Sequence, residues 1–472
     1  MRWVAVLLAG AILAGCTVGP NYRRPPVTTP DQFYGASGPS SALSIADVPW
    51  WEIFRDPTLR SLIDEALRNG YDARIAAARV EEARARYGIA GADYYPSIGY
   101  QAAVERGHTS TFATPSDVTG SLIVANVSLA WEADLWGRIR RLNEAARAQY
   151  LATEEGRRGV ILSLVAEVAS TYFDLRELDQ ELEIAQRTRA SFQDTFDLFK
   201  RRLEGGTASA LETSRAEASL ASEAAQVPLV EQRIVAKENQ LNLLLGRVPG
   251  PIPRGASLAD QPTPPSIPDG LPASLLVKRP DVREAEQQLI AANANVGVAQ
   301  AAFYPTLSLT GLLGGQSPEL SSLLNSGRMW SIEAGLLGPI FEGGRLRAQK
   351  RVALAQFEEA RLAYEQGVTN ALGEVSTTLV ALQKLGEEET QRARAVAADQ
   401  EAVRLATLRY ESGLSAYFEV LDAMEQLLTA ENALAQTRRD RLVELALFYK
   451  ALGGGWQGSD AATGASTPAP MR

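Results

Sequence analysis

Two acidic side chains near the C-terminal end of the chain, Glu419 and Asp422, have a spacing that would let them act together. They follow the pair Ser412-Gly413, which interrupts a long alanine-rich and charged segment, and Phe418 stands directly before them. In a helix, residues three apart share one face, so the two carboxylates would form a negative patch that attracts cations. The alternative is a solvated helix face without a role, and the spacing fits both interpretations.

The one cysteine of the chain, Cys16, follows an apolar run at residues 3–14. That run is too short to span a bilayer as a helix, but it has the length of a signal-peptide core. The residues Leu13 to Gly15 resemble a bacterial lipobox, so we predict cleavage before Cys16, with diacylglycerol on its thiol and an acyl chain on the freed amine. Three acyl chains bury enough methylene groups to hold a protein on a membrane. A buried free thiol is the other interpretation. By resemblance to bacterial lipoproteins, Thr17 favours the outer membrane.

The residues offer little for catalysis. The single histidine, His108, lies in a predicted loop, and with no second cysteine one chain cannot form a histidine-based metal site or triad. The pairs Gly205-Gly206 and Gly343-Gly344 do not follow a strand as a phosphate-binding loop does, so they are better interpreted as helix ends. We therefore expect no enzymatic activity, no metal and no cofactor other than the covalent lipid.

Composition narrows the class further. The net charge of -9 and the pI near 5.1 argue against a nucleic-acid partner, which would require a basic face. With 46% hydrophobic residues, the 472-residue chain can bury a substantial core.

Four stretches alternate apolar and polar residues with the period of a β-strand. They lie near 96–106, 121–132, 305–313 and 329–338, and each is long enough to cross a bilayer when tilted. Gly-, Ser-, Thr- and Asn-rich segments at 106–120 and 314–328 are predicted as the connecting loops. Two soluble hairpins on a helical body would show the same pattern. Membrane strands, however, need every backbone group paired, so four strands would require copies from other chains.

The alternation also predicts which side chains would face lipid and which would face a lumen. The expected lipid-facing set is Ile98, Tyr100, Val127, Leu129, Leu309 and Ile332. The expected lumen-facing set is Gln101, Asn126, Ser128, Thr310 and Glu333.

These strands alternate with long helical segments in a duplicated chain. Residues 137–203 and 343–411 are rich in good helix formers and would each extend about 100 Å if unbroken. Arg202, Gly206 and Glu212 recur 207 positions later, whereas Asp72 and Pro96 recur 209 positions later. Glycine ends a helix at little steric cost, so we predict that Gly205-Gly206 and Ser412-Gly413 reverse the two long helices.

The expected organisation is therefore α+β, with two repeats of helices and strands separated by a proline-rich connector. Its boundaries are a signal peptide at 1–15, a lipidated extended segment at 16–55, the first repeat at 56–247, the connector at 248–272, the second repeat at 273–456 and a disordered tail at 457–472.

Seven stretches in order resemble the TolC-type outer-membrane efflux factors of Gram-negative bacteria, and most closely their NodT or OprM-like lipoprotein branch. They are CTVGPNY from Cys16, WWEIFRDPTL from Trp50, DLWGR from Asp134, KRPDV from Lys278, YPTLSL from Tyr304, FEGGRL from Phe341, and residues 409–423. Together they span nearly the whole mature chain. Glu342, Lys278 and Met424 depart from the residues that the family often has there.

The resemblance implies a homotrimer whose twelve strands form one barrel in the outer membrane and whose helices form a periplasmic tunnel. It implies a periplasmic adaptor (membrane fusion) protein and an inner-membrane resistance-nodulation-division pump as partners, with export of drugs, toxic compounds or metal ions. It also implies a gate at the periplasmic tip, where Phe418 would narrow the duct and Glu419 and Asp422 would attract cations, partly restrained by arginines such as Arg215.

Two alternatives remain open at this point. A non-channel periplasmic coiled-coil lipoprotein would use the helices as a scaffold, but it would have no use for the four strands. An outer-membrane duct of a type I protein-secretion system would keep the fold and change the partner.

Overall fold

The computed structural model describes residues 17–36, 47–111, 114–261 and 272–454, and the expected signal peptide, Cys16 and the tail lie outside them. The chain divides into two compact units, and each takes segments from both repeats. Unit 1 combines the described residues up to 26 with 79–154 and 284–365. Unit 2 combines 27–78, 155–283 and 366 onwards. Long helices contribute residues to both units.

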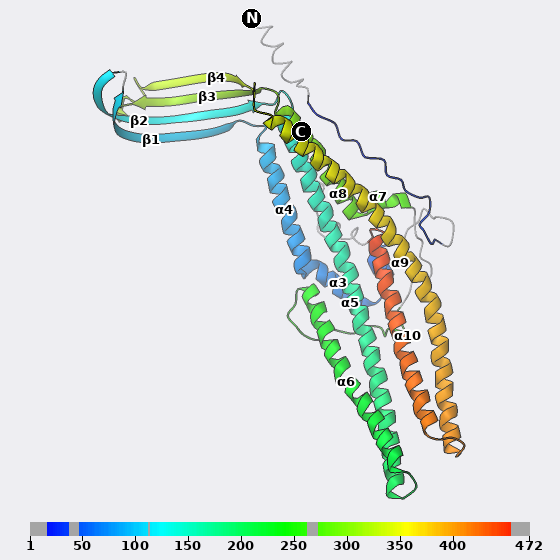
Figure 1. The fold of residues 1–472 in the computed structure, drawn as a ribbon. Helices are drawn as coiled ribbons and strands as arrows, with labels where there is room; N and C mark the ends of the chain where they lie inside the picture. Colours follow the sequence, from blue (N-terminus) through cyan, green and yellow to red (C-terminus); the bar gives the residue numbers. More distant parts are fainter. Residues whose placement is uncertain (1–16, 37–46, 112–113, 262–271, 455–472) are drawn as a thin grey trace. The chain divides into compact units, whose positions relative to one another are not determined.

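Unit 1 contains a four-stranded antiparallel sheet, shown in Figure 1. Its strands are β1 (Ser97–Thr111), β2 (Thr114–Ala133), β3 (Thr306–Ser317) and β4 (Arg328–Leu337), in the order β1-β2-β3-β4. The register aligns Ile98, Leu129, Gly311 and Ile332 in one row across the sheet. Because side chains alternate along each strand, the register places all the predicted lipid-facing residues on one face and all the predicted lumen-facing residues on the other.

The first hairpin is longer than the sequence indicates. Residues 106–120 were expected to form a loop, but β1 and β2 pair as far as Thr111 and Thr114, and His108 lies opposite Thr119 within the ladder. The register slips between Thr109 and Thr111. Backbone hydrogen bonds define this ladder, and they do not require alternating apolar side chains, so the distal part of the hairpin carries no strand period. In the second hairpin, β3 likewise extends to Ser317, and a 3-10 turn, η3 (Leu320–Ser322), precedes β4.

The helices of unit 1 are parts of α4 (Tyr71–Ala92), α5 (Arg138–Glu204), α8 (Pro280–Ala301) and α9 (Arg345–Glu411). Ala145 and Ala148 of α5 pack against Ala291 and Ala294 of α8. These small side chains allow the two helix backbones to approach closely. On α5, Tyr150 also stacks on Tyr87 of α4, with ring centroids 6.2 Å apart.

An extended N-terminal segment, residues 17–24, is fixed to the helices of unit 1. The Arg141 guanidinium donates to the carbonyls of Val18 and Gly19 and, at 2.7 Å, to Asn21 Oδ1. Arg24 makes a two-pronged ion pair with Glu286 of α8, with both N–O distances at 2.6 Å. Bidentate contacts of this kind hold geometry as well as charge, so the chain beyond Cys16 has a defined path.

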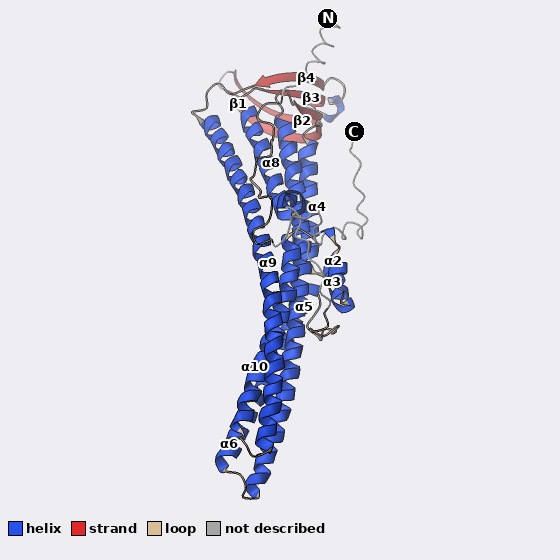
Figure 2. Ribbon diagram, turned by 90° about the vertical axis from the view of Figure 1, so that its right-hand side faces the viewer, coloured by secondary structure: helices blue, strands red, loops and turns tan. Residues whose placement is uncertain are grey.

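Unit 2 contains the hairpin ends of the long helices. Its own elements are α2 (Trp50–Ile53), α3 (Pro57–Asn69), α6 (Ala210–Leu245), η2 (Pro272–Ser274), α7 (Leu275–Lys278) and α10 (Phe418–Ala451). Figure 2 shows the helices and strands by type. Fully buried aromatic side chains, among them Tyr172, Phe173 and Phe448, form its core. Among the described residues, no helix combines the length and the apolarity that a membrane span requires.

Candidate functional site at the hairpin tips

The two helical hairpins of unit 2 reverse direction with the same backbone geometry. Gly206 and Gly413 both have φ of 71°, in the left-handed region that favours glycine. At the first turn, Gly206 N donates to Leu203 O at 2.9 Å and Thr207 N donates to Arg202 O at 2.8 Å. Gly413 and Leu414 make the equivalent pair of bonds to Tyr410 O and Arg409 O, both 2.9 Å. This pair of bonds is the Schellman motif, which satisfies the last carbonyls of a helix.

Gly205 and Ser412 occupy the position before each of these glycines. Gly205 N donates to Arg201 O, and Ser412 N donates to Leu408 O, both at 3.0 Å. The Ser412 hydroxyl also donates to Leu408 O at 2.8 Å. Both residues therefore continue the hydrogen bonding of the incoming helix up to the turn.

The outgoing helices begin differently in the two hairpins. Ser209 and Glu212 form a capping box at the start of α6, in which Glu212 N donates to Ser209 Oγ and Ser209 N donates to Glu212 Oε2. The hydrogen bonds that the Ser209 amide and hydroxyl donate to the carboxylate lower the pKa of Glu212. The repeat equivalent of Ser209 is Ala416, which cannot cap, and α10 begins at Phe418 without a side-chain cap. The carboxylate of Glu419 is therefore available for another partner.

That partner is Arg409, whose Nε lies 3.3 Å from Glu419 Oε2. Both ends of this ion pair come from the second hairpin, and Arg215, which the family resemblance implies as a restraining residue, is not part of it. The pair is about half exposed on both sides, so its contribution to stability is small. Its consequence is positional, since it holds the Glu419 carboxylate beside the Ser412-Gly413 turn.

An aromatic cluster joins the two hairpins just behind the turns. Tyr417 packs edge-on against Phe199, with centroids 4.8 Å apart, and against Tyr410 at 5.1 Å. The hydroxyls of Tyr417 and Thr195 share a hydrogen bond of 2.7 Å, and the Arg202 guanidinium contacts the Tyr410 hydroxyl. Phe199 and Thr195 lie on α5, so contacts between aromatic rings hold the first hairpin against the second.

The remaining candidate residues are exposed. Phe418 is 61% exposed and Leu414 is 70% exposed, although both are apolar. Asp422 is also exposed, on the same side of α10 as Glu419. One turn further along, Glu425 faces Glu223 of α6, where burial and then the charge of Glu425 raise the pKa of Glu223. The tip therefore presents apolar and acidic side chains together.

Sequence reasoning missed the aromatic cluster and the second acidic pair. Comparison of the repeats contains a signal for the cluster, because the equivalents of Tyr410 and Tyr417 in the first repeat are Leu203 and Ala210. Aromatic residues that appear on both sides of one turn and are absent from its copy indicate a role specific to the second hairpin. The proximity of Glu223 and Glu425 has no signal in the sequence, because it depends on how α6 packs against α10.

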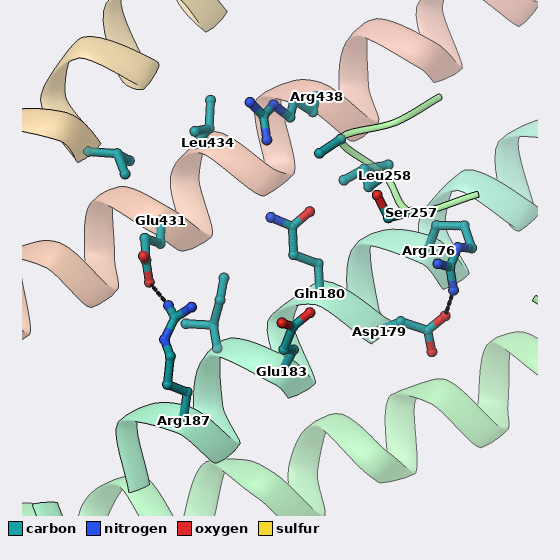
Figure 3. Close-up of a pocket in the computed structure, with 13 residues that line it drawn as sticks. Arg176, Asp179, Gln180, Glu183, Arg187, Ser257, Leu258, Glu431, Leu434 and Arg438 are labelled. Atoms are coloured by element: carbon teal, nitrogen blue, oxygen red, sulfur yellow. Dashed lines mark hydrogen bonds and ion pairs between the residues drawn. The ribbon is translucent and has the colours of Figure 1, made fainter. Parts of the chain in front are cut away.

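A pocket lies further along the helices of unit 2. Figure 3 shows this pocket of about 320 Å³ between α5, α10 and the segment around Ser257. Its arginines have carboxylate partners: Arg176 pairs with Asp179, Arg187 with Glu431 and Arg438 with Glu389. Paired charges leave little potential for binding an ion. Within the part of the chain that the structure describes, no cluster of three His, Cys, Asp or Glu side chains could hold a metal.

The sequence and the fold match those of known proteins. The sequence profile of the outer membrane efflux protein family matches residues 62–247 and 271–454. The solvent efflux pump outer membrane protein SrpC of Pseudomonas putida is 36% identical over 459 residues, which cover 95% of this chain and 97% of SrpC. SilC of Salmonella typhimurium, a probable outer membrane lipoprotein, is 33% identical over 449 residues, covering 94% and 97%.

A solved structure gives the same result. The open state of the MtrE outer membrane channel of Neisseria gonorrhoeae aligns with a TM-score of 0.84 and 32% identity, covering 93% of this chain and 99% of MtrE. Both helical hairpins and all four strands fall within the matched ranges. The chain belongs to the outer membrane efflux protein family.

Proposed function

We propose that this chain is one protomer of a trimeric outer-membrane duct that exports small molecules in a tripartite efflux system. Its partners would be a periplasmic adaptor protein and an inner-membrane resistance-nodulation-division pump. The observation that carries this proposal is the match of both repeats to the efflux family, at 62–247 and 271–454. The match of SrpC, a solvent efflux protein, favours small apolar or toxic compounds as the cargo.

The sheet supports assembly from several chains. Within the described residues, β1 and β4 each pair on one side only, and the outer edges of both strands lack partners. In a membrane, unpaired backbone groups cost several kcal/mol each, so such edges must be closed by other strands. Three copies of four strands would give a barrel of twelve. A periplasmic scaffold protein would have no need for this sheet.

The transport function can be tested in cells that lack the gene. Deletion should increase susceptibility to several unrelated toxic compounds, and the wild-type gene supplied on a plasmid should restore resistance. Secretion of large proteins should be unchanged, which separates an efflux duct from a type I secretion duct. Unchanged susceptibility to solvents, antibiotics and metal ions would contradict the proposal.

The hairpin tip supports a gate. Phe418 is exposed at the start of α10 and would narrow the duct sterically. Glu419 and Asp422 lie three residues apart on one face, so three copies would place six carboxylates around the axis and make the entrance attractive to cations. The aromatic cluster that holds the two hairpins together would stabilise the closed arrangement.

The gate is tested by bilayer recordings of the Glu419→Gln, Asp422→Asn double variant. Cation selectivity and block by trivalent cations should both weaken, because each protomer loses two charges at the entrance. Raising the salt concentration should reduce the difference from wild type, because salt screens exposed charges. The matched control is Glu387→Gln with Glu401→Gln, two exposed acids on α9 away from the turn. If the tip variant keeps wild-type selectivity and block, these residues are not part of the gate.

The lipid anchor would lie where the sheet of unit 1 meets its helices. Cys16 is outside the described residues, but Thr17 packs against Gly137 in the short link between β2 and α5. Gly137 has φ of 80°, and a Cβ there would come within 2.9 Å of Thr17 Cα. Val18 N also donates to Trp136 O at 3.0 Å. An acyl group on Cys16 would therefore enter the membrane beside the end of β2.

Mass spectrometry of outer-membrane material should show a mature chain that begins at triacylated Cys16. We expect the acyl chains to aid targeting rather than to build the duct, so Cys16→Ala with a cleavable signal peptide should still form trimers, at reduced yield in the outer membrane. An unmodified residue 16 in protein from the outer membrane would disprove the anchor.

A further inference from the structure

We propose that β4 of one copy pairs with β1 of the next copy in a fixed register that the internal duplication specifies. In this register, Leu336 lies opposite Ala102 of the next copy, and Ala334 lies opposite Val104 of the next copy. The inference rests on the proposed trimer and adds which residues meet at the seam between its protomers.

The first step is that the sheet itself obeys the duplication. Adding 209 to a residue number in β1 and 207 to its partner in β2 gives a pair in the second hairpin. Ile98 opposite Leu129 becomes Leu307 opposite Leu336, and both pairs are present. Gln101 opposite Asn126 becomes Thr310 opposite Glu333, which is also present. The two hairpins are therefore copies in register, and the two-residue difference in length lies in the hairpin end between the paired strands.

The second step uses the contact between the hairpins as a template. Inside the chain, β2 of the first repeat pairs with β3, the first strand of the second repeat. The equivalent contact for the second repeat joins β4 to the first strand of a following repeat, which is β1 of another copy. The pair Leu129 opposite Gly311 then specifies Leu336 opposite Ala102, and Val127 opposite Leu313 specifies Ala334 opposite Val104.

The edges are suited to this pairing. Residues 331–337 of β4 would align with residues 107–101 of β1, so the pairing extends over most of β4. Val104 is 77% exposed and Leu336 is 67% exposed, although both are large and apolar. In the proposed seam they would share the face that carries Ile98, Leu129 and Ile332.

In unit 1, two helices also expose positions whose equivalents in the other repeat are covered within the chain. Within the chain, Ala145 of α5 is buried against α8, but its equivalent in α9, Val352, is 56% exposed. On the short helices, a Cβ on Gly297 of α8 would lie 2.9 Å from the Arg141 side chain, whereas a Cβ on its equivalent Gly88 in α4 would have no atom of the described residues within 4 Å. Thus α9 and α4 leave free the surfaces that their copies, α5 and α8, use to contact each other. A following copy would cover both.

The register can be tested by disulfide cross-linking of the full chain in outer membranes. The variant Leu336→Cys, Ala102→Cys should form covalent dimers and trimers on mild oxidation, and a reductant should return them to monomers. Two controls shift the register by two residues on the same face: Leu336→Cys with Tyr100→Cys, and Leu336→Cys with Val104→Cys. The Cβ atoms of directly opposite residues lie about 5 Å apart, whereas diagonal neighbours lie about 7–8 Å apart. The predicted pair should therefore form its disulfide roughly tenfold faster than either control pair. Variants that carry only one of the two introduced cysteines show whether Cys16 itself takes part in any cross-link.

The outcomes separate the register from the assembly. Faster linking of a shifted pair would overturn the register and leave the trimer standing. If the protein is trimeric but none of the pairs links, and a second predicted pair, Ala334→Cys with Val104→Cys, also fails, then β4 does not meet β1 of the next copy. Monomeric protein extracted from membranes, without any cross-link, would instead contradict the proposed duct.

Discussion

A single buried carboxylate, Asp56, connects three segments of unit 2. It caps α3 by accepting from Thr58 N at 2.8 Å, and it accepts from the hydroxyl of Tyr172 on α5 at 2.8 Å. Leu59 N, Gln261 Nε2 and Ala256 N also donate to this carboxylate. Burial acts to raise the pKa of Asp56, but the hydrogen bonds from Gln261 and Tyr172 outweigh it and lower the pKa. The ionised form is therefore part of the fold.

Replacement of Asp56 should destabilise the protein in a pH-dependent way. The variant Asp56→Asn should lower the free energy of unfolding by about 2–3 kcal/mol, because hydrogen bonds to a charged group are lost. A lowered pKa in the folded state means that this stability is present above the ordinary pKa of aspartate and is lost as the pH falls through the folded value. Thermal unfolding at pH 7 and pH 3 measures the loss, which should be smaller at pH 3. The exposed Asp31→Asn is the control, and equal effects of both variants would disprove the role.

A second buried acid, Glu177, has the opposite character. It is 4% exposed on α5, beside a pocket of about 230 Å³ that Asp174, Arg233 and Arg439 also line. Burial, followed by the charge of Glu181, raises the pKa of Glu177 to about 7. The two arginines act in the other direction but do not cancel the burial. At neutral pH this carboxyl is therefore only partly ionised.

The pH dependence follows from the sign of this shift. Because the folded pKa is raised, Glu177 stabilises the fold below its ordinary pKa, and this contribution is lost as the pH rises towards 7. The variant Glu177→Gln should therefore increase the free energy of unfolding by roughly 1–3 kcal/mol at pH 8 and have little effect at pH 4. Thermal unfolding at the two pH values provides the measurement. Glu183→Gln, at an exposed position of the same helix, serves as control and should show no gain at pH 8.

At the scale of elements, the two hairpins show how one substitution in a duplicated motif changes its role. Glu212 completes a capping box with Ser209, so its carboxylate stabilises a helix end. Its copy, Glu419, follows Ala416 instead, and α10 begins one residue later than the repeat alignment with α6 would place it. The loss of a cap thus converts a structural acid into one that faces the tip.

Restoring the cap tests this relation. The variant Ala416→Ser offers a hydroxyl to the backbone N–H of Glu419 in place of the Ala416 carbonyl, which accepts from it at 3.1 Å, and should draw the Glu419 carboxylate away from Arg409. The free energy of unfolding should rise by about 1 kcal/mol, a usual value for an N-cap. Block of the channel by trivalent cations should weaken at the same time. Ser209→Ala is the control in the first hairpin and should cost about 1 kcal/mol without changing the block. Unchanged block in Ala416→Ser would separate the cap from the gate.

The long helices and the four strands could be predicted from the sequence because their signals are local. Glycine at 206 and 413 marks a left-handed turn, and alternation along β2 marks the face of a strand. The distal hairpin at 106–120 could not be predicted, since backbone pairing alone requires no pattern in the side chains. The pairing of Glu419 with Arg409 and the cluster of Phe199, Tyr410 and Tyr417 depend on packing between elements, and only a comparison of the repeats points to the two tyrosines.

At the scale of the whole molecule, the duplication supplies equivalent building blocks and the differences between the repeats supply function. The two sheet hairpins keep the same register, which suits a closed ring of repeated units. The tip residues differ, with tyrosines, a missing cap and a second acid in the second repeat alone. The proposed trimer would contain six similar sheet hairpins and six helical hairpins, three of which are specialised, so its barrel can stay fixed while its tip carries the gate.

The sheet faces provide the most direct test of this arrangement in the membrane. Leu129 lies on the apolar face beside Ile98 and Ile332, and its neighbour Ser128 points to the other face. Arginine on a lipid-facing strand position near the bilayer centre costs about 2–4 kcal/mol, and a water-filled lumen removes most of that cost. The variant Leu129→Arg should therefore greatly reduce the yield of heat-resistant trimer in outer membranes, whereas Ser128→Arg should leave the yield near that of wild type and alter ion selectivity instead. Both variants change adjacent residues of one strand by the same side chain, so differences in synthesis or export cannot account for the contrast. Equal losses of trimer in the two variants would show that the sheet does not separate lipid from water as the register indicates.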